Sequence, residues 1–418
     1  MTRHFYTTLI TYLDYFLPIL DRNIYSTEKP WVNSRFRQLI KKRQNAYRSG
    51  DITTYRRCRN QVSRLARKLR AQFYTRKVDQ LHNSDQHSWW KHVRAFLNIK
   101  PKPTYSHLEA PDNKPLPDAI NDFFATVAED LEPINSDLLP TLTLDYCSDY
   151  TIDVHQVTKR LLNINVYKAT GPDFLPNWIL RDFATLIAEP LTAVFNASVR
   201  EGTVPDIWKS AIVIPAPKVH PPKTISSDLR PISLLPVLGK ILESFVADWL
   251  CDFLAPTLDP NQFGGLKGRS TAHALVSILH SWCSTLDQGG SVRALFVDFT
   301  KAFDRVDHNI LLTKLKDRGI PHCLVKWFHS YLRLRRQTVR VDNQYSDWLY
   351  ITAGMPQGSP LGLLSFLLLI DDLTVDCLTH KYVDDTTLTE LLPRGSQQTY
   401  MHTFLQQLLK ESVHVSLL

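Results

Sequence analysis

Two adjacent aspartates interrupt a strand-like stretch near the end of this 418-residue chain. The residues before them, 377–380, and after them, 386–389, predict the arms of a β-hairpin with Asp384 and Asp385 at its tip. Like charges repel and strands disfavour aspartate, so the pair is poorly suited to stabilising a fold. Hard divalent cations take oxygen ligands and cancel this repulsion, so the pair indicates a cation site. For either acid alone, an exposed turn residue is the alternative.

A third acid strengthens this interpretation. Asp298 ends the run 292–297, which is apolar apart from Arg293 and is expected to form a strand buried on both faces. An acid that closes a buried strand, together with an acid pair on a hairpin, is the layout that a two-metal phosphoryl-transfer site requires.

Segments in the second half of the chain resemble, in the same order, the motifs of reverse transcriptases of non-LTR (LINE-type) retrotransposons. The matching segments are 168–173, Lys218 with 229–235, 294–304, 353–362 and 382–385. The segment 294–304 is similar to the first catalytic motif of this family, 353–362 to the second, and 382–385 to the third, which carries the acid pair.

The resemblance implies an α+β fold, with the fingers and palm of a right-hand polymerase, an antiparallel palm sheet, and a basic helical arm before it. The implied activity is RNA-directed DNA polymerisation that requires Mg²⁺, with Mn²⁺ as a substitute. The implied partners are an RNA template, a DNA primer and dNTPs, with no protein partner. An RNA-dependent RNA polymerase is the rival enzyme, although it usually has glycine where this chain has Tyr382-Val383. A remnant without activity that only binds nucleic acid is the rival outside enzymes.

The same resemblance assigns roles to charged residues. Asp298 and Asp384 are expected to be the shared metal ligands, while Asp385 either holds metal loosely or steadies the hairpin. Lys218 and Arg230 are expected to meet the triphosphate, the first as a point charge and the second as a fork that binds two oxygens.

Three further residues are expected to shape the nucleotide pocket. In the family an aromatic ring at the position of Phe303 closes the floor of the sugar pocket and excludes a ribose 2′-hydroxyl; a plain core phenylalanine is the alternative. The Gln357 amide can both donate and accept hydrogen bonds, and Gly358 permits close backbone approach to the template–nucleotide pair. A bare turn is the alternative there.

The net charge of +8 is concentrated in an N-terminal arm. Residues 29–77 hold 16 Lys or Arg and a single acid, Asp51, whereas the rest of the chain has a net charge of −7. The spacing of apolar residues predicts helices broken at Gly50-Asp51. Such an arm suits phosphate contacts, although a solvated helix surface is the alternative. The expected nucleic-acid contacts are Lys41, Lys42, Arg43, Arg56, Arg57, Arg67, Lys68 and Arg70.

Composition predicts four regions: an N-terminal segment (1–28), the basic helical arm (29–100), a proline-rich linker with a short helix (101–150), and fingers and palm (151–418, core motifs 199–390). Only 33 residues follow Asp385, so we expect a fragment that lacks a thumb and an upstream endonuclease. No run of eighteen apolar residues or leader with a cleavage site occurs, so no membrane contact is expected. The six scattered cysteines favour a reducing compartment, hence an intracellular protein, nuclear or cytoplasmic.

Overall fold

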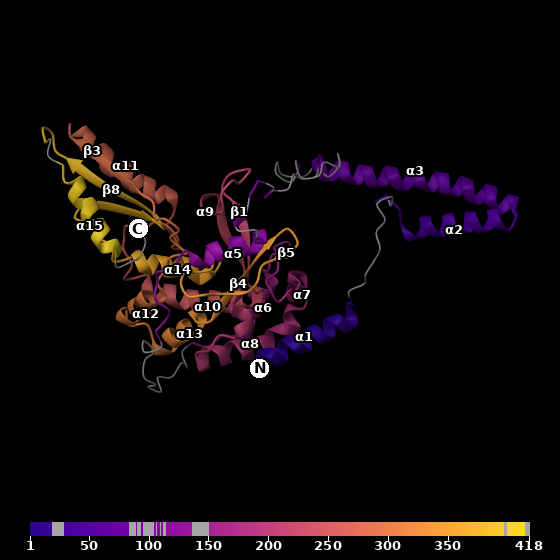
Figure 1. Cartoon of the computed structure of the whole chain (residues 1–418), viewed down its shortest axis with the longest axis horizontal. Helices are drawn as coiled ribbons and strands as arrows, with labels where there is room; N and C mark the ends of the chain where they lie inside the picture. Colours follow the sequence, from indigo (N-terminus) through magenta and orange to yellow (C-terminus); the bar gives the residue numbers. More distant parts are fainter. Residues whose placement is uncertain are drawn as a thin grey trace. The chain divides into compact units, whose positions relative to one another are not determined.

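The computed structural model describes residues 1–18, 29–82, 89, 93–94, 104–105, 107–108, 110–111, 114–135, 150–396 and 399–413 (Figure 1). The chain divides into two compact units, one made of residues 1–8 with 105–418 and the other of residues 9–104. Residues 136–149 and several shorter stretches of the predicted linker, together with residues 414–418, lie outside the described residues.

The smaller unit contains an antiparallel pair of helices, α2 (Ser34–Arg48) and α3 (Ile52–His82), seen in Figure 1. The chain reverses at Gly50, which has a positive φ of 74°, a conformation that glycine adopts without strain. The Asp51 carboxylate then accepts a hydrogen bond from the Thr54 amide (2.9 Å) and caps α3. The predicted break at Gly50-Asp51 is confirmed.

The larger unit contains a three-stranded antiparallel sheet in the order β3 (Ser291–Val297), β8 (Asp385–Leu392), β7 (Leu378–Tyr382). Strands β7 and β8 form the predicted hairpin, with Tyr382 paired to Asp385 across a two-residue turn. Helix α11 (Thr271–Asp287) covers one face, where Trp282 donates to Thr389. Helix α15 (Met401–Val413) follows β8, and Glu390 of that strand accepts from Tyr400 just before the helix.

Strand β3 corrects one prediction. The run 292–297 was expected to be buried on both faces, but β3 is an edge strand whose residues alternate between exposed and half-buried. The Phe296 side chain is 72% exposed. An apolar run is compatible with a central strand, yet in a sheet of only three strands β3 has a neighbour on one side alone.

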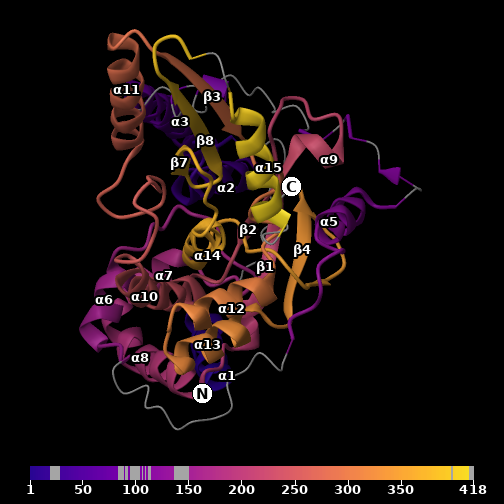
Figure 2. The same cartoon turned by 90° about the vertical axis from the view of Figure 1, so that its left-hand side faces the viewer.

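A second, mixed sheet lies beside the first in the larger unit (Figure 2). Its order is β2-β1-β4-β5, with β6 also paired to β4; β1 and β4 are parallel and the other pairs antiparallel. The strands are β1 (Ser210–Pro217), β2 (Leu229–Leu234), β4 (Arg335–Val341), β5 (Gln344–Tyr345) and β6 (Leu349–Ile351). Helix α5 (Leu116–Thr126) packs on this sheet, with Ile120 buried against Val213 and Val339.

Most of the remaining helices of the larger unit form a shared core below the two sheets (Figure 2). They are α6 (Val154–Leu162), α7 (Asn177–Asp182), α8 (Ala184–Glu201), the 3₁₀ turn η4 (Asp206–Lys209), α10 (Val237–Leu254), α12 (His308–Asp317), α13 (His322–Leu332) and α14 (Pro360–Ile370). The short helix α9 (Ile225–Asp228), between β1 and β2 in the chain, lies apart from this core and has no buried residue. Helix α14 is almost wholly buried because it packs against both α10 and α12. Among the described residues, no helix is long and apolar enough to span a bilayer.

The first residues of the chain pack into this larger unit. The side chain of Tyr6, in helix α1 (Thr2–Phe16), is buried, donates to Asp173 and accepts from the Trp208 indole, both at 3.0 Å. Burial, with the nearby Asp173 charge, raises the pKa of Tyr6, so the phenol stays protonated as a donor. An N-terminal residue is thereby joined to the segment 168–173.

Candidate active site

The predicted catalytic acids lie at one end of the three-stranded sheet. The last paired residues of β3 and β8 are Val297 and Thr386, so the next residues along the ladder are Asp298 and Asp385. Asp384 occupies the turn between β7 and β8. Strand register and the hairpin turn therefore bring Asp298 close to the adjacent acids Asp384 and Asp385, which lie more than 80 residues further along the chain.

The electrostatics of this group match the prediction from sequence. Burial raises the pKa of the half-buried Asp384, and the negative charges of Asp385 and Asp298 raise it further, while Arg230 lowers it. Carboxylate oxygens that repel one another are suitable ligands for a divalent cation. Across the described part of the chain, however, no three acids, histidines or cysteines are already close enough to form a complete ligand set.

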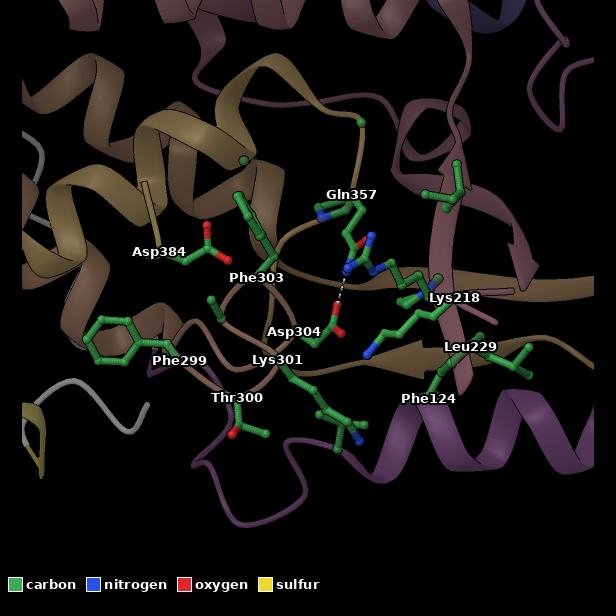
Figure 3. A pocket seen from close by; sticks show the side chains of 18 of the residues that line it. Phe124, Lys218, Leu229, Phe299, Thr300, Lys301, Phe303, Asp304, Gln357 and Asp384 are labelled. Atoms are coloured by element: carbon green, nitrogen blue, oxygen red, sulfur yellow. Dashed lines mark hydrogen bonds between the residues drawn. The ribbon is translucent and has the colours of Figure 1, made fainter. Parts of the chain in front are cut away.

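A cavity of about 840 Å³ opens beside the acids (Figure 3). Seven of the eight predicted site residues line it: Lys218, Arg230, Asp298, Phe303, Gln357, Gly358 and Asp384. The eighth, Asp385, is exposed at the start of β8 and is not among the lining residues. The cavity is thus bounded by Asp298 and Asp384 on one side and by Lys218 and strand β2 on the other.

Backbone hydrogen bonds join the first two catalytic motifs and hold the cavity wall together. The amide of Gly354 donates to Val306 O and that of Met355 to Phe303 O, both at 2.8 Å. Gly354 has φ +78°, and a Cβ there would lie 2.6 Å from the Asp304 carbonyl oxygen, so only glycine fits this approach. The pairing places the Gln357 loop directly over the segment after β3.

Gln357 is oriented from two sides. Its Nε2 donates to Asp304 Oδ1 (3.0 Å, dashed in Figure 3), and its backbone carbonyl accepts from the Ser233 amide of β2 (3.0 Å). Gly358, the next residue, is exposed with φ +108°. The loop therefore presents backbone to the cavity, and the close approach of a nucleotide at Gly358 stays a prediction.

The two predicted phosphate-binding residues extend from the second sheet. Lys218 directly follows β1 and Arg230 lies in β2, and both side chains are exposed. The connection between these strands is rigid because the Asp228 carboxylate accepts from the amides of Lys223 and Thr224. These hydrogen bonds lower the pKa of Asp228 to about 2. An exposed ammonium and guanidinium at a cavity rim are suited to binding phosphate oxygens.

Phe303 is both a cavity wall and a packing residue. Its half-buried ring lines the cavity and lies 5.3 Å from the ring of Phe366 in α14, centroid to centroid. Packing against a buried helix fixes the orientation of the ring. The two interpretations from sequence, a sugar-pocket wall and a core residue, are therefore compatible.

The structure adds cavity residues that sequence reasoning missed. Asp304 is half-buried, and burial raises its pKa to about 6, while Gln357, Lys301 and Lys218 lower it. The Lys301 ammonium lies 4.1 Å from the centre of the Phe123 ring of α5. Asp304 and Lys301 adjoin Phe303 in the first motif and could have been found there, whereas nothing local to Phe123 connects α5 with the motifs.

The mixed helix-and-sheet fold with its antiparallel sheets is consistent with a polymerase palm, and sequence comparison supports this class. Residues 217–417 match the family model for reverse transcriptase (RNA-dependent DNA polymerase). This part of the chain therefore carries a reverse transcriptase domain, as the motifs predicted.

The individual relatives are proteins of mobile elements from Drosophila melanogaster. The chain is 32% identical over 224 residues to the probable RNA-directed DNA polymerase from transposon BS (53% of this chain, 25% of that protein). It is 30% identical over 272 residues to the RNA-directed DNA polymerase from mobile element jockey (61% and 30%) and 34% identical over 220 residues to that of transposon X-element, named as probable (52% and 24%). The chain spans about a quarter of the length of these relatives.

The predicted nucleic-acid residues of the arm lie in the separate helical unit. All eight belong to α2 or α3, and all except the half-buried Arg43 are exposed. The helices pack through a short apolar seam that includes Phe36, Ala46, Cys58 and Val62. Because the seam uses the apolar side chains, the basic side chains remain at the surface of the unit.

Asp304 generates a prediction about the pH dependence of stability. Its pKa is about 6 in the folded protein against an ordinary value of 3.8, so its contribution to stability is full below about pH 4 and is lost as pH rises through 6. Asp304→Asn mimics the protonated form and still accepts from Gln357. We expect it to raise the free energy of unfolding at pH 8, by about 3 kcal/mol at most, with little effect at pH 4.

Urea unfolding of the parent and the variant at pH 4, 6 and 8 measures this difference. Asp252→Asn, at an exposed position of α10, is the control and should show no pH-dependent gain. A variant that is less stable than the parent at pH 8 would mean that Asp304 is ionised and held by the two lysines.

Proposed function

We propose that this chain is an RNA-directed DNA polymerase of a retrotransposon, which adds dNTPs to a primer 3′-hydroxyl on an RNA template. The observation that carries the proposal is the shared cavity: two motif acids, two cations, an aromatic ring and the Gln357-Gly358 loop meet around one space. The family match supports the reaction class, and the names of the relatives support the mobile-element context.

Asp298 and Asp384 would hold Mg²⁺, or Mn²⁺ in its place, with Asp385 adjacent on the ladder. Their oxygen donors and mutual repulsion fit such a cation, which when bound supplies charge neutralisation at the phosphates and activation of the hydroxyl. Lys218 and Arg230 bind the triphosphate oxygens from the opposite rim. The phosphoryl group is therefore placed between fixed charges of both signs.

Phe303 and Gln357 position the sugar and base ends of the nucleotide. The ring of Phe303 is fixed by Phe366, so it excludes an added 2′-hydroxyl by shape. Asp304 accepts from Gln357 Nε2, which leaves the amide oxygen of Gln357 as an acceptor for the nucleotide or template strand. Selection of dNTP over rNTP also separates this proposal from an RNA-dependent RNA polymerase.

The arm gives sequence-independent affinity for the template or primer. Seven exposed cations on two packed helices form a rigid cationic surface that releases counterions when it binds phosphates.

The first prediction concerns the two acids. Asp298→Asn and Asp384→Asn each remove a negatively charged ligand of the cation with little change in the shape of the side chain. Primer extension on poly-rA/oligo-dT should fall by more than about 100-fold. The loss of a residue that only orients a metal ligand already lowers metal affinity or activity by about 10- to 100-fold. Thermal unfolding of Asp384→Asn should be unchanged or shifted upward, because burial and neighbouring acids disfavour the charge. Asp252→Asn is the matched control, and near-parental activity in either acid variant would refute the assignment.

The second prediction concerns sugar selection. Phe303→Val shortens the side chain that walls the cavity, so incorporation of rNTP relative to dNTP should rise by roughly tenfold or more. Phe303→Tyr keeps a ring at this position and should retain the parental ratio. Single-nucleotide insertion with matched dNTP and rNTP measures both. If dNTP use persists in Phe303→Val and the ratio does not move, Phe303 is a packing residue alone.

The third prediction concerns the arm. Replacing Arg67, Lys68 and Arg70 by Gln in the full chain should weaken RNA binding at every sequence tested. It should also reduce the slope of log K against log salt by about two, at roughly 0.7 for each single-strand phosphate contact. A control that neutralises the exposed Lys159, Arg200 and Lys410 removes the same charge from the other unit. An equal loss of RNA affinity in both variants, measured by fluorescence anisotropy, would indicate a net-charge effect and contradict a specific role for the arm.

A further inference from the structure

The catalytic hairpin is held along its outer edge by a loop that none of the expected motifs includes. We name residues 259–265 the clamp loop. The amide of Lys381 in β7 donates to Asn261 O (2.9 Å), and the amide of Phe263 donates to Lys381 O (2.8 Å). The clamp loop therefore pairs with the free edge of β7 in parallel, beside the turn that carries Asp384.

One side chain of the clamp loop reaches the turn itself. Gln262 is only 2% exposed, and its Oε1 accepts from the amides of Val383 and Gly264, both at 3.0 Å. Two N–H donors face this end of the amide, so the oxygen and not the NH₂ group must occupy it. The Nε2 end has no hydrogen-bond partner within the described part of the chain.

The contact falls on a strained residue. Val383 has φ +58°, a left-handed conformation that is rare for a β-branched side chain and persists only where the surroundings impose it. Gly264 allows the close contact, because a Cβ there would lie 2.6 Å from Val383 N. Asp384 directly follows Val383, so the backbone angle of Val383 sets the direction of the Asp384 carboxylate.

The clamp loop is also anchored to β7 and to the end of α14, through Lys381 and Asp371. The Lys381 side chain is 1% exposed, forms an ion pair with Asp259 (2.9 Å) and donates to the carbonyl oxygens of Ile370 (3.0 Å) and Asp371 (3.2 Å) at the end of α14. The Asp259 amide in turn donates to the Asp371 carboxylate (2.7 Å). The clamp loop is thus attached to the buried core around α14, and this attachment fixes the position in which it holds the turn.

We propose that Gln262 is a positioning residue that holds the Val383 amide and so sets the geometry of the Asp384 carboxylate. Gln262 does not line the cavity and acts on the reaction through the hairpin alone. The kinetic consequence rests on the proposed polymerase function, whereas the effect on the turn does not. The two are therefore measured separately.

Gln262→Met in the full chain keeps the length and bulk of the side chain but removes the acceptor. Hydrogen exchange at the Val383 amide should accelerate by about tenfold, since one buried hydrogen bond is lost. Mn²⁺ binding, followed by electron paramagnetic resonance, should weaken. In primer extension, kcat should fall by about 10- to 100-fold because the carboxylate is misplaced, while KM for dNTP stays within about twofold. Gln262→Glu restores an acceptor oxygen and should recover Val383 protection and part of kcat.

The control is Gln407→Met in α15, which removes two hydrogen bonds to Asp376 and leaves the clamp loop intact. It should leave Val383 exchange, Mn²⁺ binding and kcat at parental values. The proposal would be overturned if hydrogen exchange at Val383 is unchanged in Gln262→Met. It would also be overturned if Gln262→Met and Gln262→Glu lose Val383 protection and kcat equally. If the parent shows no primer extension, the polymerase proposal fails, and the exchange and Mn²⁺ measurements still decide the role of Gln262.

Discussion

Repulsion among carboxylates at one sheet end is the constraint on which the rest of the larger unit depends. Strand register places Asp298 beside Asp385, and the hairpin turn adds Asp384 to them. Without a bound cation this arrangement opposes folding, and burial together with the charges of Asp385 and Asp298 raises the pKa of Asp384. The interactions that hold the arrangement do not involve the three acids themselves: they are the buried Lys381 ion pair in β7 and the packing of the apolar helix α14.

Local patterns were sufficient to predict the elements that carry the chemistry. The β7–β8 hairpin and the apolar helix after the Gln357 loop are present where alternation and continuous apolar character indicated them. The prediction that β3 is buried on both faces was wrong, because the composition of one strand does not reveal how many neighbouring strands it will have. The position of Phe123 in the cavity follows from tertiary pairing and was not readable from local spacing, whereas Asp304 adjoins Phe303 in the first motif.

The resemblance to reverse transcriptases and the geometry contribute different information. The motifs identified Gln357 by its neighbours in sequence, whereas the structure shows how Gln357 is held in place. Asp304 fixes its side chain, and the Ser233 amide fixes its backbone. The motifs likewise did not include residues 259–265, because a loop that acts through hydrogen bonds on a neighbouring strand has no chemistry of its own. Family resemblance locates groups that touch substrate more readily than groups that orient them.

The departures from ordinary stability rules are concentrated around the cavity. Asp304 is a half-buried acid with a raised pKa, Val383 has a left-handed backbone, and the acids of the hairpin repel one another. Each feature is unfavourable for folding, and each lies within the elements that bring phosphate, sugar and cation ligands together. A sequence under selection for stability alone would replace these residues first. Their concentration at one cavity, with a compact apolar core around α10 and α14 to offset them, is what the proposed polymerase function requires.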